Sequence, residues 1–165
     1  MGKNLRDIAR NSDKKRKDKS KVIKIKLDRI GKKKPKRWDH WNVWFLFTVK
    51  SQETAGVTYS VIIQTIEDVG ITSENWKDLA TGKIPMMVNC SCPDFKYRQE
   101  VALNKVGNAM IRDSNGAMPV ITNPKMIPYL CKHSLACFKR VKELVRKYNI
   151  SNIDDIRTKN YYDDK

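Results

Sequence analysis

Four residues in two short segments have the types and the spacing of metal ligands. One residue separates Cys90 from Cys92, and one separates Cys131 from His133. Alternate side chains of a strand point to the same face, so Cys90 and Cys92 would project together. Cys131 and His133 precede a helical pattern of apolar residues, which places them at a strand-to-helix corner or on a first helical turn. Three thiolates and one imidazole suit a closed tetrahedral zinc site, so these four residues are predicted to bind Zn²⁺.

Three other interpretations of the cysteines are weaker. Two disulfides would require an oxidising compartment, and the N-terminus has no apolar signal-peptide segment. Cys131 could be a thiol nucleophile with His133 as its base, but two further cysteines at ligand spacing favour a metal. Cys137 lies four residues after His133 and could be an alternative ligand, although a lone helical cysteine is usually a small buried hydrophobe. A filled Cys₃His shell leaves no open metal position, so neither an enzyme activity nor a small-molecule substrate is predicted.

The order Cys-x-Cys, a long spacer, Cys-x-His and then a helix resembles the SWIM-type zinc finger. Residues 92–98 (Cys-Pro-Asp-Phe-Lys-Tyr-Arg) and the segment 121–124 (Ile-Thr-Asn-Pro) also resemble SWIM-like proteins of large tailed bacteriophages. The resemblance covers about residues 85–145 and carries over only the four ligands, and its 38-residue spacer between Cys92 and Cys131 is long for the family. It implies zinc as the cofactor, binding to nucleic acid or protein, and a location in the virion or otherwise in the host cytoplasm.

The positive charge of the chain is concentrated at its N-terminus. The net charge of the 165-residue chain is +16, and residues 1–37 hold 17 lysines and arginines against 4 aspartates, a net of +13. Blocks of like charge repel one another, so residues 1–37 are predicted to form a basic arm that is disordered when free. Within it, residues 22–27 alternate apolar and basic and could add as a strand to a sheet edge. So much charge predicts a polyanionic partner, DNA more than RNA, or another protein, although a solvated tail or a localisation signal is the alternative.

The candidate nucleic-acid contacts lie in this arm and on a predicted helix over residues 95–105. They are Lys14, Lys15, Arg16, Lys17, Lys32, Lys33, Lys34, Lys36, Arg37, Lys96 and Arg98. Lys96 and Arg98 flank Tyr97, and such a basic and aromatic face can contact phosphates. The same spacing also describes an ordinary amphipathic surface helix.

Residues 38–150 are predicted to form an α+β domain: a small antiparallel sheet with two or three helices around the Cys₃His site. An extended N-terminal basic arm precedes this domain, and a C-terminal tail over residues 151–165 follows it. Strands are predicted over residues 38–50, 57–66 and 84–92, with the aromatic run in 38–47 more typical of core than of a base-stacking platform. Helices are predicted over 73–79 with Ser73 as N-cap and an end near Gly82, over 95–105 with Asp94 as cap, and from Cys131 to about residue 148. Turn formers and prolines predict a loop over 106–129, a length that is usually functional or ordered by a partner.

Two functions follow from these features. The favoured one is a non-enzymatic, zinc-binding virion or assembly protein of a phage, whose basic arm contacts nucleic acid or neighbouring subunits. The alternative is a nucleic-acid-binding regulatory zinc-finger protein that acts in the host cell outside the virion. No stretch approaches the roughly 20 apolar residues of a membrane span, so no membrane partner is expected.

Overall fold

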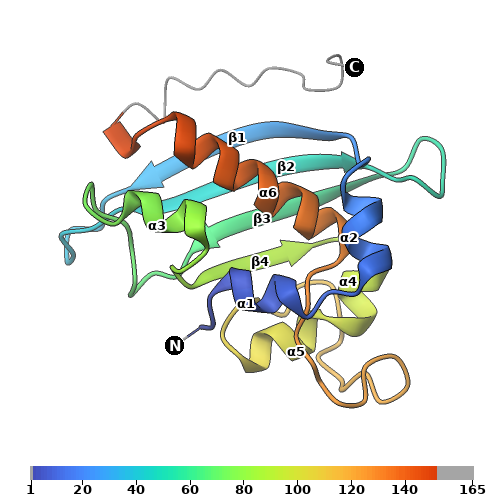
Figure 1. Ribbon diagram of the computed structural model, residues 1–165. Coiled ribbons are helices and arrows are strands. Elements are labelled where there is room, and N and C mark those ends of the chain that lie inside the picture. The colour runs from blue at the N-terminus through green and yellow to red at the C-terminus, as the bar shows by residue number, and fades with distance from the viewer. Residues whose placement is uncertain (1, 152–165) are drawn as a thin grey trace.

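One antiparallel sheet with the strand order β1-β2-β3-β4 forms the centre of the fold (Figure 1). The structure, a computed structural model, describes residues 2–151. Its strands are β1 (Ile25–Lys33), β2 (Asn42–Lys50), β3 (Thr58–Thr65) and β4 (Met86–Cys90). Its helices are α1 (Leu5–Arg10), α2 (Lys14–Ser20), α3 (Trp76–Thr81), α4 (Pro93–Arg98), α5 (Glu100–Lys105) and α6 (Lys132–Lys147). The α+β class is confirmed, with six helices in the described residues where two or three were expected.

Alternation along the strands determines which side chains enter the core. The residues of β2 that point to one face are all completely buried: Val43, Phe45, Phe47 and Val49. Phe47 pairs with Val61 of β3, and Val61 pairs in turn with Cys90 at the end of β4. Cys90 therefore lies on the same buried face. The three predicted strands form, but β2 begins only at Asn42, and β4 ends at Cys90, so Cys92 lies outside the strand that was predicted to contain it. The two phenylalanines of the aromatic run are core residues as expected, whereas Trp38 is 42% exposed.

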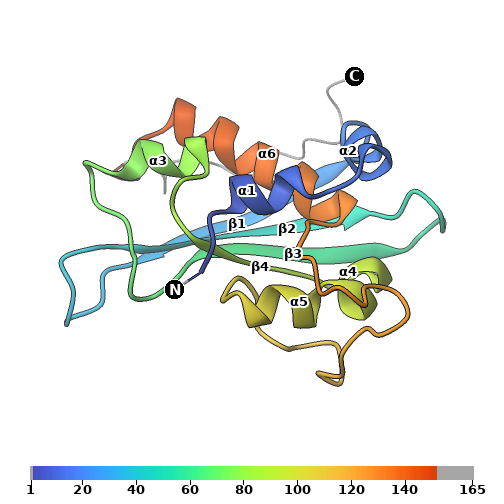
Figure 2. The same cartoon turned by 60° about the horizontal axis from the view of Figure 1, so that its bottom comes forward.

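The helices cover the two sides of the sheet unequally. In Figure 2, α1, α3 and α6 lie on one side of the sheet, while α4 and α5 lie on the other side near β4. α6 packs against β2, β3 and β4. At its far end, the buried Trp76 of α3 donates its indole N–H to the carbonyl oxygen of Tyr148 over 2.6 Å. This arrangement brings the first turn of α6 to the end of β4, where Cys90 lies.

The N-terminal segment is part of the folded domain, so the prediction of an extended arm was wrong for residues 2–33. Leu5 and Ile8 of α1 are almost completely buried, and Leu27 of β1 faces the core. Among the charged residues of this segment, Leu5 and Ile8 are three residues apart, as on one face of a helix, and Leu27 lies on the inward face of a strand. Lysine side chains can keep their ammonium groups in water while such neighbours are buried, so net charge alone did not predict disorder. The edge strand expected over residues 22–27 does form, as β1, but it starts three residues later.

Two other predicted helices differ in detail. α3 ends at Gly82 in the left-handed conformation, as expected, but its N-cap is Asn75 instead of Ser73. The helix predicted over residues 95–105 is broken at Gln99, whose φ is −116° and whose side-chain oxygen accepts the N–H of Tyr129 over 2.8 Å. This long-range contact with the loop separates α4 from α5. The N-cap of α4 is Cys92, which leaves Asp94 free to bind cations from elsewhere in the fold.

The predicted loop over residues 106–129 is confirmed, and a buried carboxylate anchors part of it. Glu100 of α5 is completely buried and accepts the backbone N–H groups of Arg112, Asp113 and Ser114 over 2.9, 3.0 and 2.7 Å. Burial acts to raise the pKa of Glu100. The hydrogen bonds from the Ser114 region outweigh it and hold that pKa below its ordinary value.

Glu100→Gln is expected to lower the free energy of unfolding by about 1–3 kcal/mol at pH 7, because an amide offers one acceptor oxygen where the carboxylate offers two. A depressed folded-state pKa stabilises the protein above the unfolded pKa of about 4.5, and this stabilisation is lost as the pH falls through the folded-state value. Urea unfolding near pH 7 and near pH 3 should therefore show a difference between the two proteins that shrinks in acid. Glu74→Gln, at an exposed position, is the control. An equal difference at both pH values would contradict this role.

Two expectations concern membranes and the C-terminus. Within residues 2–151, no helix has both the length and the apolar character needed to cross a bilayer. The predicted tail lies outside the described residues from position 152 onward.

Candidate metal centre

The four predicted ligands come together where β4 ends and α6 begins. One donor atom from each of Cys90, Cys92, Cys131 and His133 lies within 4.8 Å of the other three, and all four residues are buried. Cys90 is the last residue of β4, Cys92 precedes α4, and Cys131 precedes α6. The predicted convergence of the two segments is confirmed.

Two of the cysteines are helix N-caps. Cys92 Sγ accepts the backbone N–H of Phe95, and Cys131 Sγ accepts that of Ser134, each over 3.4 Å. The Ser134 hydroxyl also lies 3.2 Å from Cys131 Sγ. Because the N-terminus of a helix carries partial positive charge, it favours the ionised sulfur. The caps thus orient both sulfurs and stabilise their thiolate forms.

The N-terminal segment braces the second ligand pair. The buried Ser12 hydroxyl donates to the carbonyl oxygen of Leu130 and accepts the Leu130 N–H, both over 3.0 Å. Asn11 donates its side-chain amide to the carbonyl oxygen of Pro128 over 2.9 Å. Leu130 is the residue before Cys131, so the turn between α1 and α2 holds the backbone that presents Cys131 and His133.

The three thiols differ in their readiness to ionise. Burial raises the pKa of Cys90 well above its ordinary value, and a hydrogen bond to Cys131 raises the pKa of Cys92. Burial also opposes ionisation of Cys131, but hydrogen bonds from Cys90 and Cys92 outweigh it and hold the pKa of Cys131 well below the usual range. Ionising all three sulfurs calls for a cation at their centre.

The donor set fits a zinc ion by geometry and by chemistry. Four atoms no more than 4.8 Å apart lie within about 2.9 Å of a common point, and shortening to Zn–S of about 2.3 Å and Zn–N of about 2.0–2.1 Å needs shifts below about 1 Å. His133 Nε2 is buried with no hydrogen-bond partner, and Nδ1 lies 4.0 Å from Cys90 Sγ. Neither ring nitrogen has a closer protein partner, so one of them is free to coordinate a metal at the cluster. The structure thus contains a Cys₃His cluster that could hold a metal ion.

Cys137 lies outside this group of four. It is completely buried in α6, and burial raises the pKa of its thiol well above the ordinary value. This agrees with the expectation that Cys137 is a core residue.

The candidate nucleic-acid residues fall into two groups at opposite ends of the sheet. The first, which we name the α2–α4 cluster, lies beside the metal centre and consists of Lys14, Lys15, Arg16, Lys17, Lys96 and Arg98. Arg16 is largely buried: its guanidinium binds both carboxylate oxygens of Asp94 over 2.9 and 3.0 Å and stacks on Tyr129 at 4.4 Å. Lys14, Lys15 and Lys17 are exposed. Arg16 thus attaches α2 to α4, whereas its lysine neighbours face solvent.

The second group, which we name the hairpin cluster, surrounds the turn between β1 and β2 and consists of Lys32, Lys33, Lys34, Lys36 and Arg37. Lys32 donates to the carbonyl oxygen of Ile150 over 3.0 Å, and Lys34 pairs with Asp39 at 2.6 Å. The nine-residue β1 connects the two ends of the sheet, and at roughly 3.3 Å per residue it separates the two clusters by about 30 Å.

Sequence reasoning missed the acidic residues at the metal end of the sheet. Glu53, in the turn between β2 and β3, accepts hydrogen bonds from Lys19 over 3.2 Å and from Lys132 over 2.7 Å. Asp94 binds Arg98 as well as Arg16. Arg98 is only four residues from Asp94, but the other three pairs join residues 34 to 79 apart along the chain, so no local pattern could have paired them.

Comparison with known proteins does not assign the chain to a family or to a known fold. The resemblance to SWIM-type fingers therefore depends only on the ligands and segments described above. No protein-family model, no curated protein and no solved structure matches this chain.

Proposed function

We propose that this protein is a non-enzymatic zinc protein that binds nucleic acid through its two basic clusters, as a component of a phage virion or of its assembly. The observation that supports it best is the position of the buried Cys₃His group, which links β4 to α6 directly beside the α2–α4 cluster. A metal at this position would hold the elements that carry the exposed lysines in fixed relative positions.

Zinc is the metal that suits this donor set. Thiolates and imidazole are preferred by Zn²⁺, whereas Mg²⁺ and Ca²⁺ prefer oxygen ligands. A four-coordinate Cys₃His site has no open position for water or substrate, and sites of this kind have a structural role. Zinc would supply cross-linking of β4 to α6, and the chain itself would supply the contacts with the partner.

Double-stranded DNA suits the spacing of the two clusters. They lie about 30 Å apart along β1, close to the roughly 34–36 Å of one helical turn of B-DNA. Lys14, Lys15 and Lys17 at one end and Lys33, Lys36 and Arg37 at the other are exposed. A duplex of about ten base pairs could thus reach both clusters.

A salt titration of binding tests this proposal. Wild-type protein should bind duplex DNA more tightly than duplex RNA, with a slope of log K against log salt of about −0.9 for each phosphate neutralised. Changing Lys14, Lys15 and Lys17 to Gln should make this slope shallower by two to three units, as roughly expected for three lost phosphate contacts. The matched control changes Lys77, Lys83 and Lys125, which are also exposed, and should leave the slope nearly unchanged. Salt-independent binding, or equal effects of the two triple variants, would contradict a specific basic surface.

One observation favours contact with protein subunits as well. The loop over residues 106–129 exposes several large apolar side chains: Met110, Ile111, Met118, Val120, Ile121 and Ile127. Ile121 is 89% exposed and its neighbour Val120 is 65% exposed, and a group of exposed apolar side chains is typical of a protein–protein contact surface. An assembly role predicts that the double variant with Val120→Ser and Ile121→Ser associates more weakly with other virion proteins but still binds DNA.

A regulatory role in the host cell predicts instead that the protein binds DNA but is missing from purified phage particles.

A further inference from the structure

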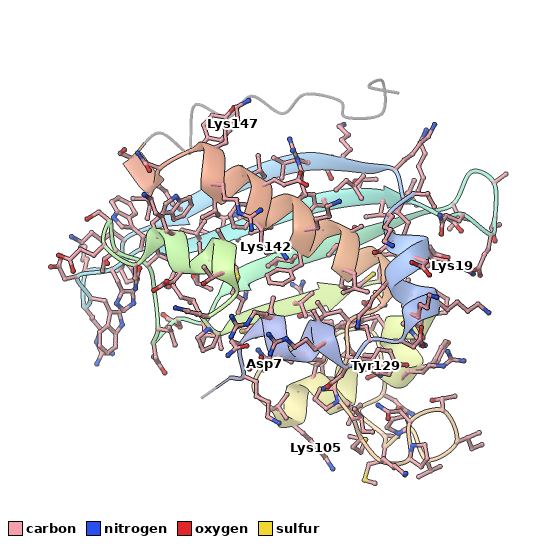
Figure 3. All side chains as sticks on the ribbon, viewed as in Figure 1. Asp7, Lys19, Lys105, Tyr129, Lys142 and Lys147 are labelled. Atoms are coloured by element: carbon pink, nitrogen blue, oxygen red, sulfur yellow. The ribbon has the colours of Figure 1, made fainter. Side chains whose placement is uncertain are left out.

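A cavity of about 660 Å³ opens beside the metal centre at the α2 end of the sheet. Its lining comes from α2, from the β2–β3 turn, from α4 and from the start of α6, and both Cys92 and His133 contribute to it. In Figure 1, α2, α4 and the first turn of α6 lie together at this end of the molecule, and Figure 3 labels Lys19 on α2 and the nearby Tyr129.

Cations from three separate helices line the cavity: Lys15, Arg16, Lys19, Arg98 and Lys132. Two of them, Arg16 and Arg98, are held by Asp94. Lys19 and Lys132 share a different partner, because one carboxylate oxygen of Glu53 lies 3.2 Å from Lys19 Nζ and 2.7 Å from Lys132 Nζ. The two lysines therefore converge on the position of a single anionic oxygen.

Glu53 differs from the other two acidic residues of the cavity, Asp13 and Asp94, because both of those bind Arg16. Asp94 is 24% exposed and accepts a two-point contact from Arg16, whereas Glu53 is 68% exposed and extends from a turn. Lys132, by contrast, is only 14% exposed, so its ammonium group requires an anion at close range. Hydrogen bonds from Lys132 and then Lys19 hold the pKa of Glu53 at about 2, so it is ionised at neutral pH. An external anion with the same oxygen geometry could replace Glu53 without rearranging the core.

The other lining groups suit a nucleotide around that anion. Tyr97 is 60% exposed on α4, whereas Tyr59, which also lines the cavity, packs with its ring centroid 5.0 Å from that of His133. Exposed aromatic rings stack on bases regardless of sequence. The Ser51 hydroxyl is within the same lining; it accepts the backbone N–H groups of Glu53 and Thr54 and can donate to a sugar or phosphate oxygen.

We infer that this cavity takes a backbone phosphate of a nucleic-acid strand between Lys19 and Lys132, and that Glu53 occupies the phosphate position until the strand displaces it. This inference rests on the proposed function. Phosphate and carboxylate oxygens accept the same charge-assisted hydrogen bonds from lysine, which is why one can replace the other. Glu53 then acts as an internal competitor that weakens binding and favours strands able to fill the whole cavity.

The test compares Glu53→Gln with Glu74→Gln, which makes the same change of charge at an exposed position on the segment before α3. Binding is measured with a fluorescent single-stranded oligonucleotide and with duplex DNA. Glu53→Gln should raise the affinity about threefold to tenfold, the effect of one competing charged contact, while Glu74→Gln should change it less than about twofold. Zinc content and circular dichroism confirm that both variants are folded.

A second comparison separates a local competitor from a general effect of charge. In protein that also carries Lys19→Met and Lys132→Met, Glu53→Gln should have no more effect than Glu74→Gln, because the contacts that Glu53 competes for are gone. A gain that persists in this background, or wild-type protein that binds with no gain from Glu53→Gln, overturns the inference while the proposed function stands. Absence of binding by wild type and by Glu53→Gln overturns both.

Discussion

Cys131→Ser is expected to abolish stoichiometric zinc binding and to lower the free energy of unfolding by at least about 5 kcal/mol. Metal binding contributes about 10–16 kcal/mol in zinc-finger peptides, which is comparable to the whole stability of a domain. Serine can still cap α6 by accepting the Ser134 N–H, so the substitution removes the thiolate while keeping the helix cap. Zinc per chain, measured by mass spectrometry, and thermal unfolding with and without a chelator give the result.

Cys137→Ala is the matched control for this loss. It removes another completely buried thiol, in the helix that Cys131 caps, but one that lies outside the ligand group. It should keep one zinc per chain and cost only about 1–2 kcal/mol for the lost packing. If Cys131→Ser retained one zinc per chain and unfolded like Cys137→Ala, the Cys₃His centre would not be the metal site.

Replacing both Leu5 and Ile8 with Ala is expected to lower the free energy of unfolding by at least about 4 kcal/mol. Truncation of a buried Leu or Ile to Ala costs about 2–5 kcal/mol, and both side chains are almost completely inaccessible to solvent. A disordered arm would predict no change at all. Urea unfolding followed by tryptophan fluorescence measures the loss, since Trp76 is buried in α3.

Val22→Ala is the control within the same segment, because Val22 is 69% exposed. It should change the stability by less than about 0.5 kcal/mol. A double Ala variant as stable as Val22→Ala would mean that α1 is not packed on the core. Deletion of residues 1–37 would remove β1 and the Ser12 contact that braces Leu130. Substitutions that remove positive charge but keep the chain intact, such as Lys to Gln, are therefore the better test of nucleic-acid binding.

The local sequence determined two kinds of feature: elements with a periodic pattern of apolar residues, and ligand pairs whose members are close together in the chain. Alternation in residues 42–50 and 58–65 defines two strands, because one face of each must be buried. Cys90 and Cys92 are two residues apart, as are Cys131 and His133, and this spacing of cysteine and histidine is typical of metal ligands. The four ligands could therefore be identified before their convergence was known. Strand alternation does not orient the first pair, because β4 ends at Cys90 and Cys92 caps α4.

Contacts between distant segments were decided only by the tertiary structure. Residues 1–37 have the charge of a disordered arm, yet the partner surfaces of Leu5, Ile8 and Leu27 come from segments later in the chain, and their burial outweighs the repulsion. The same holds for the pairing of Lys19 and Lys132 with Glu53. Hydrophobic burial and ion pairing depend on distance in space, and the composition of a segment contains no information about which surface it will meet.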